Sequence, residues 1–330
     1  MPLAQAEQLG ALELDELSLR AAGLVREGQY AEFDLRESLL GFRWSLDQTL
    51  GAKIALGSLS LLNVPVHFQS TPSDELGIVE AYGEYSSPYG AFRFGLIPLE
   101  YGVEGKTREG DLQLPRSLMY SNRVVGLRDY GMRFLTEHKG YYTRMAVHNG
   151  EGGENLDGRV WFTASWGWTD HEKVDFGFSG RTGTTKPAST SLSGDTLAGV
   201  DPTLEAKWRM GTTYIHWAPH RWTVTLSGTW GEVEQDKKKG KKFLTGFFDL
   251  GYDLTPNFGV LGRFDYFDPN DKVKKDGQRE ISLAWVWRSR EGNSRLYFIG
   301  TKVEEEGVKV NNDEFRLIWQ LTPQSLNKVR

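Results

Sequence analysis

From Leu17 to Thr322, hydrophobic and polar residues alternate with a period of two almost without interruption. In the clearest stretch, Val160, Phe162 and Trp166 alternate with polar or small residues such as Arg159. A period of two is typical of a β-strand that has one apolar and one polar face, whereas helix-period patterns are weak along most of the chain. The pattern therefore predicts an all-β fold.

The alternating stretches predict about sixteen strands, each bounded by turn residues. They lie near residues 16–25, 33–46, 51–61, 77–86, 90–99, 130–137, 140–149, 158–169, 173–184, 203–217, 220–231, 242–253, 257–267, 279–289, 294–303 and 313–322.

The connections between these strands alternate in length, apart from a short first loop. Short ones lie at 47–51, 87–90, 138–140, 170–172, 219, 255–257 and 290–293, and long ones at 62–76, 100–129, 150–157, 185–202, 232–241, 268–278 and 304–312. Tight turns at one end and longer loops at the other are typical of an up-and-down barrel. We therefore predict a transmembrane antiparallel up-and-down β-barrel over residues 16–322. A periplasmic N-terminal segment at 1–15 and a C-terminal tail at 323–330 would flank it.

The composition is compatible with such a barrel. The hydrophobic fraction is 39% and the mean hydropathy is −0.47, and no apolar run approaches the roughly 20 residues that a membrane helix needs. A barrel strand exposes only alternate residues to lipid, so its hydropathy signal is weak. The 11 tryptophans, 13 tyrosines and 17 phenylalanines suit the aromatic girdles of a membrane barrel.

The charge and the absence of cysteine narrow the function classes. A formal net charge of −5 argues against a nucleic-acid partner, which would require a basic surface. The chain has no cysteine, which excludes a disulfide framework and suits export through an oxidising periplasm. No signal-peptide pattern follows Met1, so we interpret Met1 as a start placed on a mature chain. We expect a location in the bacterial outer membrane, contact with membrane lipid and lipopolysaccharide, and no cofactor.

Four motifs in the middle third of the chain resemble those of the phosphate-selective porins O and P. In chain order they are Phe94–Pro98 (FGLIP), Arg116–Ser117, Arg128–Gly131 (RDYG) and Asn149–Gly152 (NGEG). The resemblance implies a sixteen-stranded trimeric porin whose third loop folds into the lumen as a constriction. The connection at 100–129 fits that loop.

Selective members of that family carry arginines along the pore and lysines at the narrowing, and the candidate loop has a similar set. Its cations are Lys106, Arg108, Arg116, Arg123 and Arg128. This chain departs from the family in two places. The loop at 185–202 has Lys186 as its single cation, and the chain runs on past Leu321, where such barrels usually end on an aromatic residue.

The alternation also assigns charged residues to faces. If Phe92 and Phe94 face lipid, Arg93 faces the lumen, and charges on the lipid face would cost about 2–4 kcal/mol at mid-membrane. The same rule predicts that a further set of cations faces the lumen: Arg43, Lys53, Arg133, Arg144, Arg159, Lys173, Arg181, Lys207, Arg209, Arg221, Arg263, Arg288 and Arg316. The acids that it predicts to face the lumen are Glu80, Glu84, Asp175, Glu205, Asp249, Asp253, Asp265 and Glu280.

Cations outnumber acids in these two sets, and a positively lined pore concentrates anions. The alternative is that arginines and acids pair across neighbouring strands and stiffen the wall. We predict a passive diffusion channel for small hydrophilic solutes with an anion preference, assembled as a homotrimer. Its predicted pore residues are Lys106, Arg108, Arg116, Arg123, Arg128, Arg93, Arg133, Arg144, Glu80 and Glu84.

Two other function classes stay open. An outer-membrane hydrolase would need a serine and a histidine within hydrogen-bond reach, and Ser165 and His148 are the candidates. A structural or adhesive barrel with a plugged lumen is the second. Separately, the run Lys237–Lys239 is interpreted as a solvated loop tip, with anion gathering or lipopolysaccharide binding as the alternative.

Overall fold

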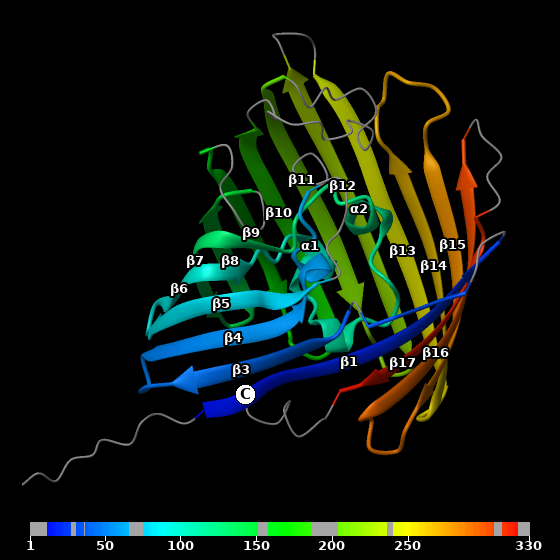
Figure 1. The fold of residues 1–330 in the computed structure, drawn as a ribbon, viewed down its shortest axis with the longest axis horizontal. Helices are drawn as coiled ribbons and strands as arrows, with labels where there is room; N and C mark the ends of the chain where they lie inside the picture. Colours follow the sequence, from blue (N-terminus) through cyan, green and yellow to red (C-terminus); the bar gives the residue numbers. More distant parts are fainter. Residues whose placement is uncertain are drawn as a thin grey trace, which may run out of the picture.

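A computed structural model describes residues 12–27, 31–35, 37–65, 75–150, 158–185, 204–235, 240–306 and 312–322. Figure 1 shows a wall of tilted strands that curves round to enclose an interior. The strands are β1 (Leu12–Arg26), β2 (Glu32–Asp34), β3 (Leu39–Ser45), β4 (Leu50–Ser58), β5 (Leu76–Ser87), β6 (Gly90–Pro98), β7 (Arg128–His138), β8 (Tyr141–His148), β9 (Trp161–Thr169), β10 (Val174–Thr185), β11 (Ala206–Trp217), β12 (Trp222–Gln235), β13 (Lys241–Thr255), β14 (Phe258–Asp268), β15 (Gln278–Arg288), β16 (Ser294–Glu305) and β17 (Glu314–Leu321).

The sheet closes on itself. From β3 to β17 each strand pairs antiparallel with the next along the chain. β17 then pairs with β1, with Leu19 opposite Leu321 and Arg26 opposite Glu314. β2 and β3 both pair with β1 and form one interrupted wall strand, so the barrel has sixteen strands. The predicted all-β up-and-down barrel is confirmed.

Several boundaries differ from the predicted ones. The strand expected at 33–46 is interrupted between β2 and β3, and the end of the strand expected at 51–61 is the 3-10 helix η1 (Leu59–Leu62). The Ser58 side chain accepts a hydrogen bond from the Ser60 backbone and begins η1, and Asn63, in the left-handed region at φ 48°, ends it. Hydroxyl capping and a left-handed asparagine both favour a short turn over an extended strand.

Two further boundaries are earlier than expected, because β1 begins at Leu12 and β7 at Arg128. The run Lys237–Lys239, Lys186 and the tail at 323–330 lie outside the described residues.

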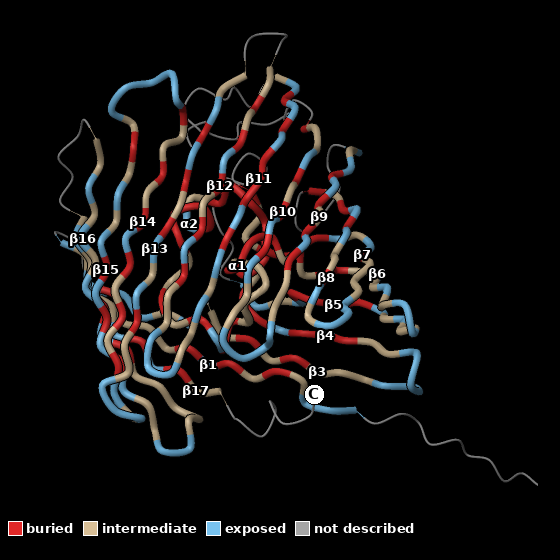
Figure 2. The backbone as a smooth tube through the Cα atoms, turned by 180° about the vertical axis from the view of Figure 1, so that it is seen from behind, coloured by how far each residue is buried: buried red, intermediate tan, exposed pale blue. Residues whose placement is uncertain are grey.

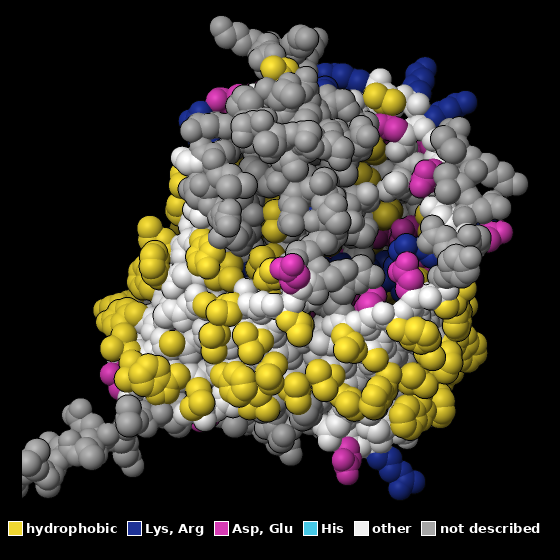
Figure 3. All heavy atoms as spheres, viewed as in Figure 1, with side chains coloured by type: hydrophobic (Ala, Val, Ile, Leu, Met, Phe, Trp, Pro, Cys, Tyr) yellow, Lys and Arg dark blue, Asp and Glu magenta, His cyan; other side chains and the backbone are white. Residues whose placement is uncertain are grey.

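The outer face of the barrel is apolar. Phe94, Leu226 and Trp285 are 73%, 53% and 57% exposed, and outward-facing aliphatic and aromatic residues recur on nearly every strand. On the face that Figure 3 shows, hydrophobic side chains form a broad band across the lower half of the molecule. In water such a band would be an aggregation surface, whereas a membrane barrel presents it to lipid.

The short turns are specified by local chemistry. Lys139 and Gly140 both have positive φ, 52° and 82°, which corresponds to the two-residue type I′ turn that matches the twist of a hairpin. In the turn before β4, the Asp47 carboxylate accepts hydrogen bonds from the backbone of Thr49 and Leu50, at 2.6 and 2.7 Å. These bonds hold the pKa of the Asp47 carboxyl below its usual range.

The connection between β6 and β7 runs through the barrel interior. It contains α1 (Gly102–Lys106), η2 (Glu109–Asp111) and α2 (Leu118–Ser121). In Figure 1 these elements lie within the ring of strands, and in Figure 2 much of the segment is coloured as buried. α1 contacts β10 and β11, η2 contacts β1, and α2 contacts β13 and β14. None of the described helices has the length and apolar content needed to cross a membrane.

We expect the folded protein to migrate faster on a denaturing gel before boiling than after it. A closed barrel pairs its backbone groups between strands and leaves no edge from which unfolding can begin. The measurement is gel mobility of paired unheated and boiled samples. Identical mobility, together with solubility in the absence of detergent, would contradict the closed membrane barrel.

Candidate functional site

The inner wall that faces the β6–β7 connection carries a row of small hydroxyl side chains. Ser165, Ser179, Thr212, Thr229 and Thr245 lie side by side on β9 to β13 in the strand register, and all five are buried. The Ser165 hydroxyl donates to the Ser179 hydroxyl at 2.8 Å, and that of Thr229 to Thr212 at 2.7 Å. Because these side chains are short, another segment of backbone can approach the wall closely. We call these five residues the hydroxyl row.

The start of the connection is bound to the hydroxyl row. The Gly102 backbone N–H donates to the Ser179 hydroxyl at 3.3 Å, and the Ser165 hydroxyl oxygen lies 3.5 Å from the Glu100 carbonyl oxygen. Gly102 has a φ of +66°, and a Cβ there would lie 3.4 Å from the Thr212 methyl group. Glycine suits both the positive φ and the close approach.

The middle of the connection is held by two buried acids. The Glu104 carboxylate accepts hydrogen bonds from the backbone N–H and the hydroxyl of Ser117, at 3.0 and 2.5 Å, and pairs with Arg263 on β14 at 3.0 Å. The Asp265 carboxylate accepts from the Leu118 backbone at 2.7 Å. Charged acceptors bonded to backbone N–H groups are among the stronger protein hydrogen bonds.

The connection also reaches the opposite wall. The Gly110 carbonyl accepts hydrogen bonds from the Gln320 side chain on β17, at 2.5 Å, and from Arg295 on β16, at 3.4 Å. Since Gly102 is bound to β10, the segment crosses the interior from one side of the barrel to the other.

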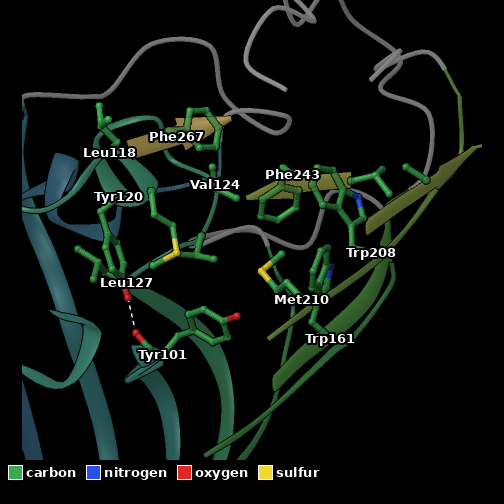
Figure 4. Close-up of a cluster of buried hydrophobic side chains, with 14 residues drawn as sticks. Tyr101, Leu118, Tyr120, Val124, Leu127, Trp161, Trp208, Met210, Phe243 and Phe267 are labelled. Carbon is green, nitrogen blue, oxygen red and sulfur yellow. Dashed lines mark hydrogen bonds between the residues drawn. The ribbon is translucent and has the colours of Figure 1, made fainter. Parts of the chain in front are cut away.

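Apolar packing adds to these polar contacts, as Figure 4 shows. The connection contributes Tyr101, Leu118, Met119, Tyr120, Val124, Val125 and Leu127, and the wall contributes Trp161, Ala206, Trp208, Met210, Val233, Phe243 and Phe267. Full burial of one large apolar side chain stabilises a fold by about 1.5–3 kcal/mol. The segment is therefore an integral part of the core.

Three cavities lie against this segment inside the barrel, and the two larger ones are rich in charged residues. The basic cavity, of about 380 Å³, has eight basic and four acidic side chains: Arg43, Lys53, Arg93, Lys106, Arg108, Arg116, Arg128 and Arg144, with Glu16, Glu80, Glu100 and Glu109. The mixed cavity, of about 320 Å³, is lined by Arg26, Arg116, Arg123, Arg263 and Arg316, with Asp34, Glu37, Asp265, Glu280 and Glu314.

The structure brings most of the predicted pore residues together. The basic cavity is lined by Arg93, Lys106, Arg108, Arg116, Arg128, Arg144 and Glu80. Arg123 lines the mixed cavity instead. Arg133, 2% exposed, and Glu84 are outside the lining of both cavities and bind residues that form it.

Most of these cations are paired with acids. Arg128 pairs with Glu80 at 3.0 Å, and Arg133 and Arg144 share Glu100, at 2.8 and 2.7 Å. The further pairs are Arg93 with Glu84, Arg43 with Glu84 and Lys53 with Glu80. The predicted alternative, in which charges pair across strands, therefore describes much of this wall.

Lys106 and Arg108 have contrasting surroundings. The Lys106 ammonium pairs with Asp175 and lies 4.9 and 5.0 Å from the ring centres of Tyr142 and Tyr214, so it anchors α1 to the wall. Arg108 is half-buried in the lining of the basic cavity, and the described part of the chain offers it no ion pair within 4.0 Å.

Sequence reasoning missed the acids of the connection. Glu100, Glu104 and Glu109 are buried or bound to arginines, but the alternation rule assigns faces only within strands. Their closeness in sequence to Arg108 and Arg116 could have predicted ion pairs, since acids and bases close together in one loop can pair.

The predicted inward placement of Lys207 and Arg209 is wrong. Both alternate with Trp208, which is 1% exposed and faces the interior, so they lie on the outer face of β11. The Arg209 side chain is 55% exposed and lies 3.7 Å from Glu234 on β12. The rule failed because β11 has aromatic residues on both faces, Trp208 inside and Trp217 outside.

Ser165 and His148 do not form the pair that a hydrolase would require. The Ser165 hydroxyl bonds to Ser179, while the His148 ring bonds to Asp129 at 2.6 Å and to Thr163 at 2.9 Å. Asp129, His148 and Thr163 are each at most 2% exposed, so a substrate has no access to this trio in the structure. Among the described residues, no group of acids and histidines could hold a metal ion.

Comparisons with known proteins bear on this arrangement. The family described as "Putative beta-barrel porin-2, OmpL-like" matches residues 24–301. No curated protein matches the chain.

Solved structures share the fold at low sequence identity. OmpT, an outer membrane protein of Vibrio cholerae in a trimer form, is 10% identical, with a TM-score of 0.70 over 96% of this chain and 100% of that one. The outer membrane channel DcaP of Acinetobacter baumannii is 10% identical, with a TM-score of 0.65 over 96% and 99%. An anion-selective porin from Comamonas acidovorans is 12% identical, with a TM-score of 0.63 over 95% and 99%.

We expect Glu104→Gln to lower the free energy of unfolding by about 1–3 kcal/mol, the usual cost of an unsatisfied buried polar group. The glutamine amide would place a donor where Arg263 also donates, and would remove the charge that Ser117 binds. Denaturant unfolding in detergent, followed by tryptophan fluorescence, measures the change. Asp111→Asn, at an exposed acid of the same connection, is the control and should unfold like the wild type. Equal stability of all three proteins would show that Glu104 does not hold the segment.

Proposed function

The chain belongs to the OmpL-like β-barrel porin-2 family, and we propose that it is a passive channel for small hydrophilic solutes with a preference for anions. It is a β-barrel of the bacterial outer membrane. The observation that carries the proposed anion preference is the basic cavity, in which cations outnumber acids by eight to four. A charged lining enclosed by low-dielectric walls concentrates ions of the opposite sign.

Ion pairing reduces this excess without removing it. Two of the acids outside the cavity lining, Asp15 and Glu84, pair with its arginines and lysines, and Asp175 pairs with Lys106. Arg108 forms no ion pair within 4.0 Å among the described residues, and Glu16, in the same lining, acts on it only at longer range. We therefore propose Arg108 as the largest single contributor to the anion preference.

The β6–β7 connection is the proposed constriction. It crosses the interior between β10 and β17, and it contributes lining residues to both cavities. A solute that passes through the barrel has to pass this segment. Its many anchors suggest a fixed narrowing and argue against a movable lid.

The partners and finer selectivity are part of the proposal. The trimer form of OmpT supports a homotrimer, and the apolar band supports contact with membrane lipid and lipopolysaccharide. Selectivity for phosphate over other anions, which the motif resemblance implies, stays a prediction.

Catalysis is not proposed, because Ser165 and His148 form hydrogen bonds with other partners. A plugged structural barrel would give no single-channel current.

In planar bilayers with a potassium chloride gradient at low salt, we expect a reversal potential that favours chloride. Low salt is chosen because screening is then weak. Arg108→Gln should reduce the preference, because it removes a cation of the basic cavity that forms no ion pair within 4.0 Å among the described residues. Arg221→Gln is the matched control, because Arg221, which the alternation rule had placed in the lumen, is an exposed turn residue in the structure. A cation preference of the wild type, or equal effects of the two variants, would contradict the assignment.

Deletion of residues 104–124, with the ends joined by glycine, should raise the single-channel conductance markedly and weaken the anion preference. The segment fills the interior and carries three of the predicted pore arginines. The control is replacement of the exposed residues 271–275 by glycine, which should leave the conductance unchanged. The gel-mobility shift shows whether each variant is folded. Unchanged conductance in a folded deletion variant would place the narrowing elsewhere.

A further inference from the structure

The basic cavity and the mixed cavity have two lining residues in common. Arg116 and Leu127 line both the basic cavity and the mixed cavity. Leu127 is fixed by its backbone, which donates to the Leu62 carbonyl at 3.0 Å and accepts from Leu99 at 2.9 Å. Arg116 is therefore the charged side chain that borders both cavities, and we call its position the junction.

Arg116 is bound in a planar, two-bond arrangement. Its two terminal nitrogens donate to the two carboxylate oxygens of Glu109, at 2.6 and 3.0 Å. The guanidinium also lies 5.8 Å from the ring centre of Tyr120. The Arg116 side chain is 10% exposed and that of Glu109 is 1% exposed, so the arginine is the partner that solute can reach.

The backbone on both sides of the pair is immobilised. Next to Glu109, the Gly110 carbonyl is bound by Gln320 and Arg295. Next to Arg116, the Ser117 backbone donates to Glu104. The pair can therefore open only through rotation of its side chains, and the main chain stays in place.

Glu109 would not be left as an unpaired buried charge if Arg116 turned away. Arg128 also approaches the Glu109 carboxylate, at 3.4 Å, and its position is fixed by the Leu61 carbonyl and by Glu80, at 2.7 and 3.0 Å. Removal of every partner from a buried charge costs several kcal/mol, and Arg128 prevents that loss. Two arginines thus share one carboxylate, and one of them can bind a second anion.

We propose that Arg116 is the selectivity-determining contact of the channel and that Glu109 occupies it when no solute does. The proposal rests on the proposed channel function. An anion that carries two oxygens in one plane, such as a carboxylate, or a phosphate, can replace Glu109 on the guanidinium fork with two parallel hydrogen bonds. A halide ion has a single acceptor atom and cannot accept the two parallel hydrogen bonds of the guanidinium fork. Solutes with carboxylate or phosphate groups are therefore held at the junction of the two cavities, and chloride passes with little retention.

The test compares wild type, Arg116→Lys and Glu109→Gln in planar bilayers, with inorganic phosphate or acetate added to a chloride solution. The readout is the concentration of each probe that halves the chloride current. Lysine keeps the charge and loses the fork, so Arg116→Lys should keep the chloride-over-potassium preference and need about tenfold more probe. Glu109→Gln weakens the competing partner, so it should need less probe than the wild type.

Arg316→Lys is the matched control, because Arg316 lines the mixed cavity only and is bound to Glu314, at 2.9 and 2.6 Å. It should respond to phosphate and acetate like the wild type. Each variant is first checked for folding by the gel-mobility shift, and Glu109→Gln supplies the test if Arg116→Lys does not fold.

The outcomes separate the two proposals. A wild-type protein without single-channel current, or with a cation preference, would overturn the proposed function and this inference with it. A conducting, anion-preferring wild type whose sensitivity to both probes is unchanged in Arg116→Lys and Glu109→Gln would overturn the inference alone. Equal loss of sensitivity in Arg116→Lys and Arg316→Lys would also overturn it, because the effect would then not be specific to the junction.

Discussion

Closure of the barrel through the pairing of β17 with β1 is the constraint on which the rest of the structure depends. It commits alternate side chains of every strand to an enclosed interior, where an unpaired charge is costly. Although the buried Arg181 stacks on the Trp161 ring, most charged residues inside meet opposite charges from another strand or from a segment that enters the lumen. Arg133 and Glu100 show this, since the arginine comes from the wall and the acid from the connection that crosses it.

The same constraint explains why the crossing segment is rich in both acids and apolar residues. Glu100, Glu104 and Glu109 neutralise wall or loop arginines, and the apolar residues pack against Trp161 and Trp208. The segment therefore completes a core that the strands alone would leave open. Arg108 forms no ion pair within 4.0 Å among the described residues, and a charge without a close ion pair at a cavity surface suggests a role toward solute.

The fold was largely predictable from the sequence, whereas the site was predictable only in part. Alternation of side chains identifies strands because one face meets lipid, and this held for stretches such as Trp161–Thr169. It failed at Lys207 and Arg209, where aromatic residues on both faces of β11 removed the contrast on which the rule depends. Alternation could not predict the ion pairs inside the lumen. Glu109 contacts Arg128 through the tertiary fold, and no periodicity encodes that contact. His148 likewise forms hydrogen bonds with Asp129 and Thr163, and not with the candidate partner Ser165.

The hydroxyl row on β9 to β13 has a consequence for how such a channel can evolve. The connection lies where it does because serine and threonine let its backbone approach the wall near Gly102. Bulkier side chains at Ser179 or Thr212 would clash with the start of the segment, since the Gly102 backbone donates to Ser179 and lies against Thr212. The width of the proposed constriction would thus depend on the wall as much as on the segment. Substitutions in strands remote from any solute contact can retune which molecules fit, while the charged residues stay unchanged.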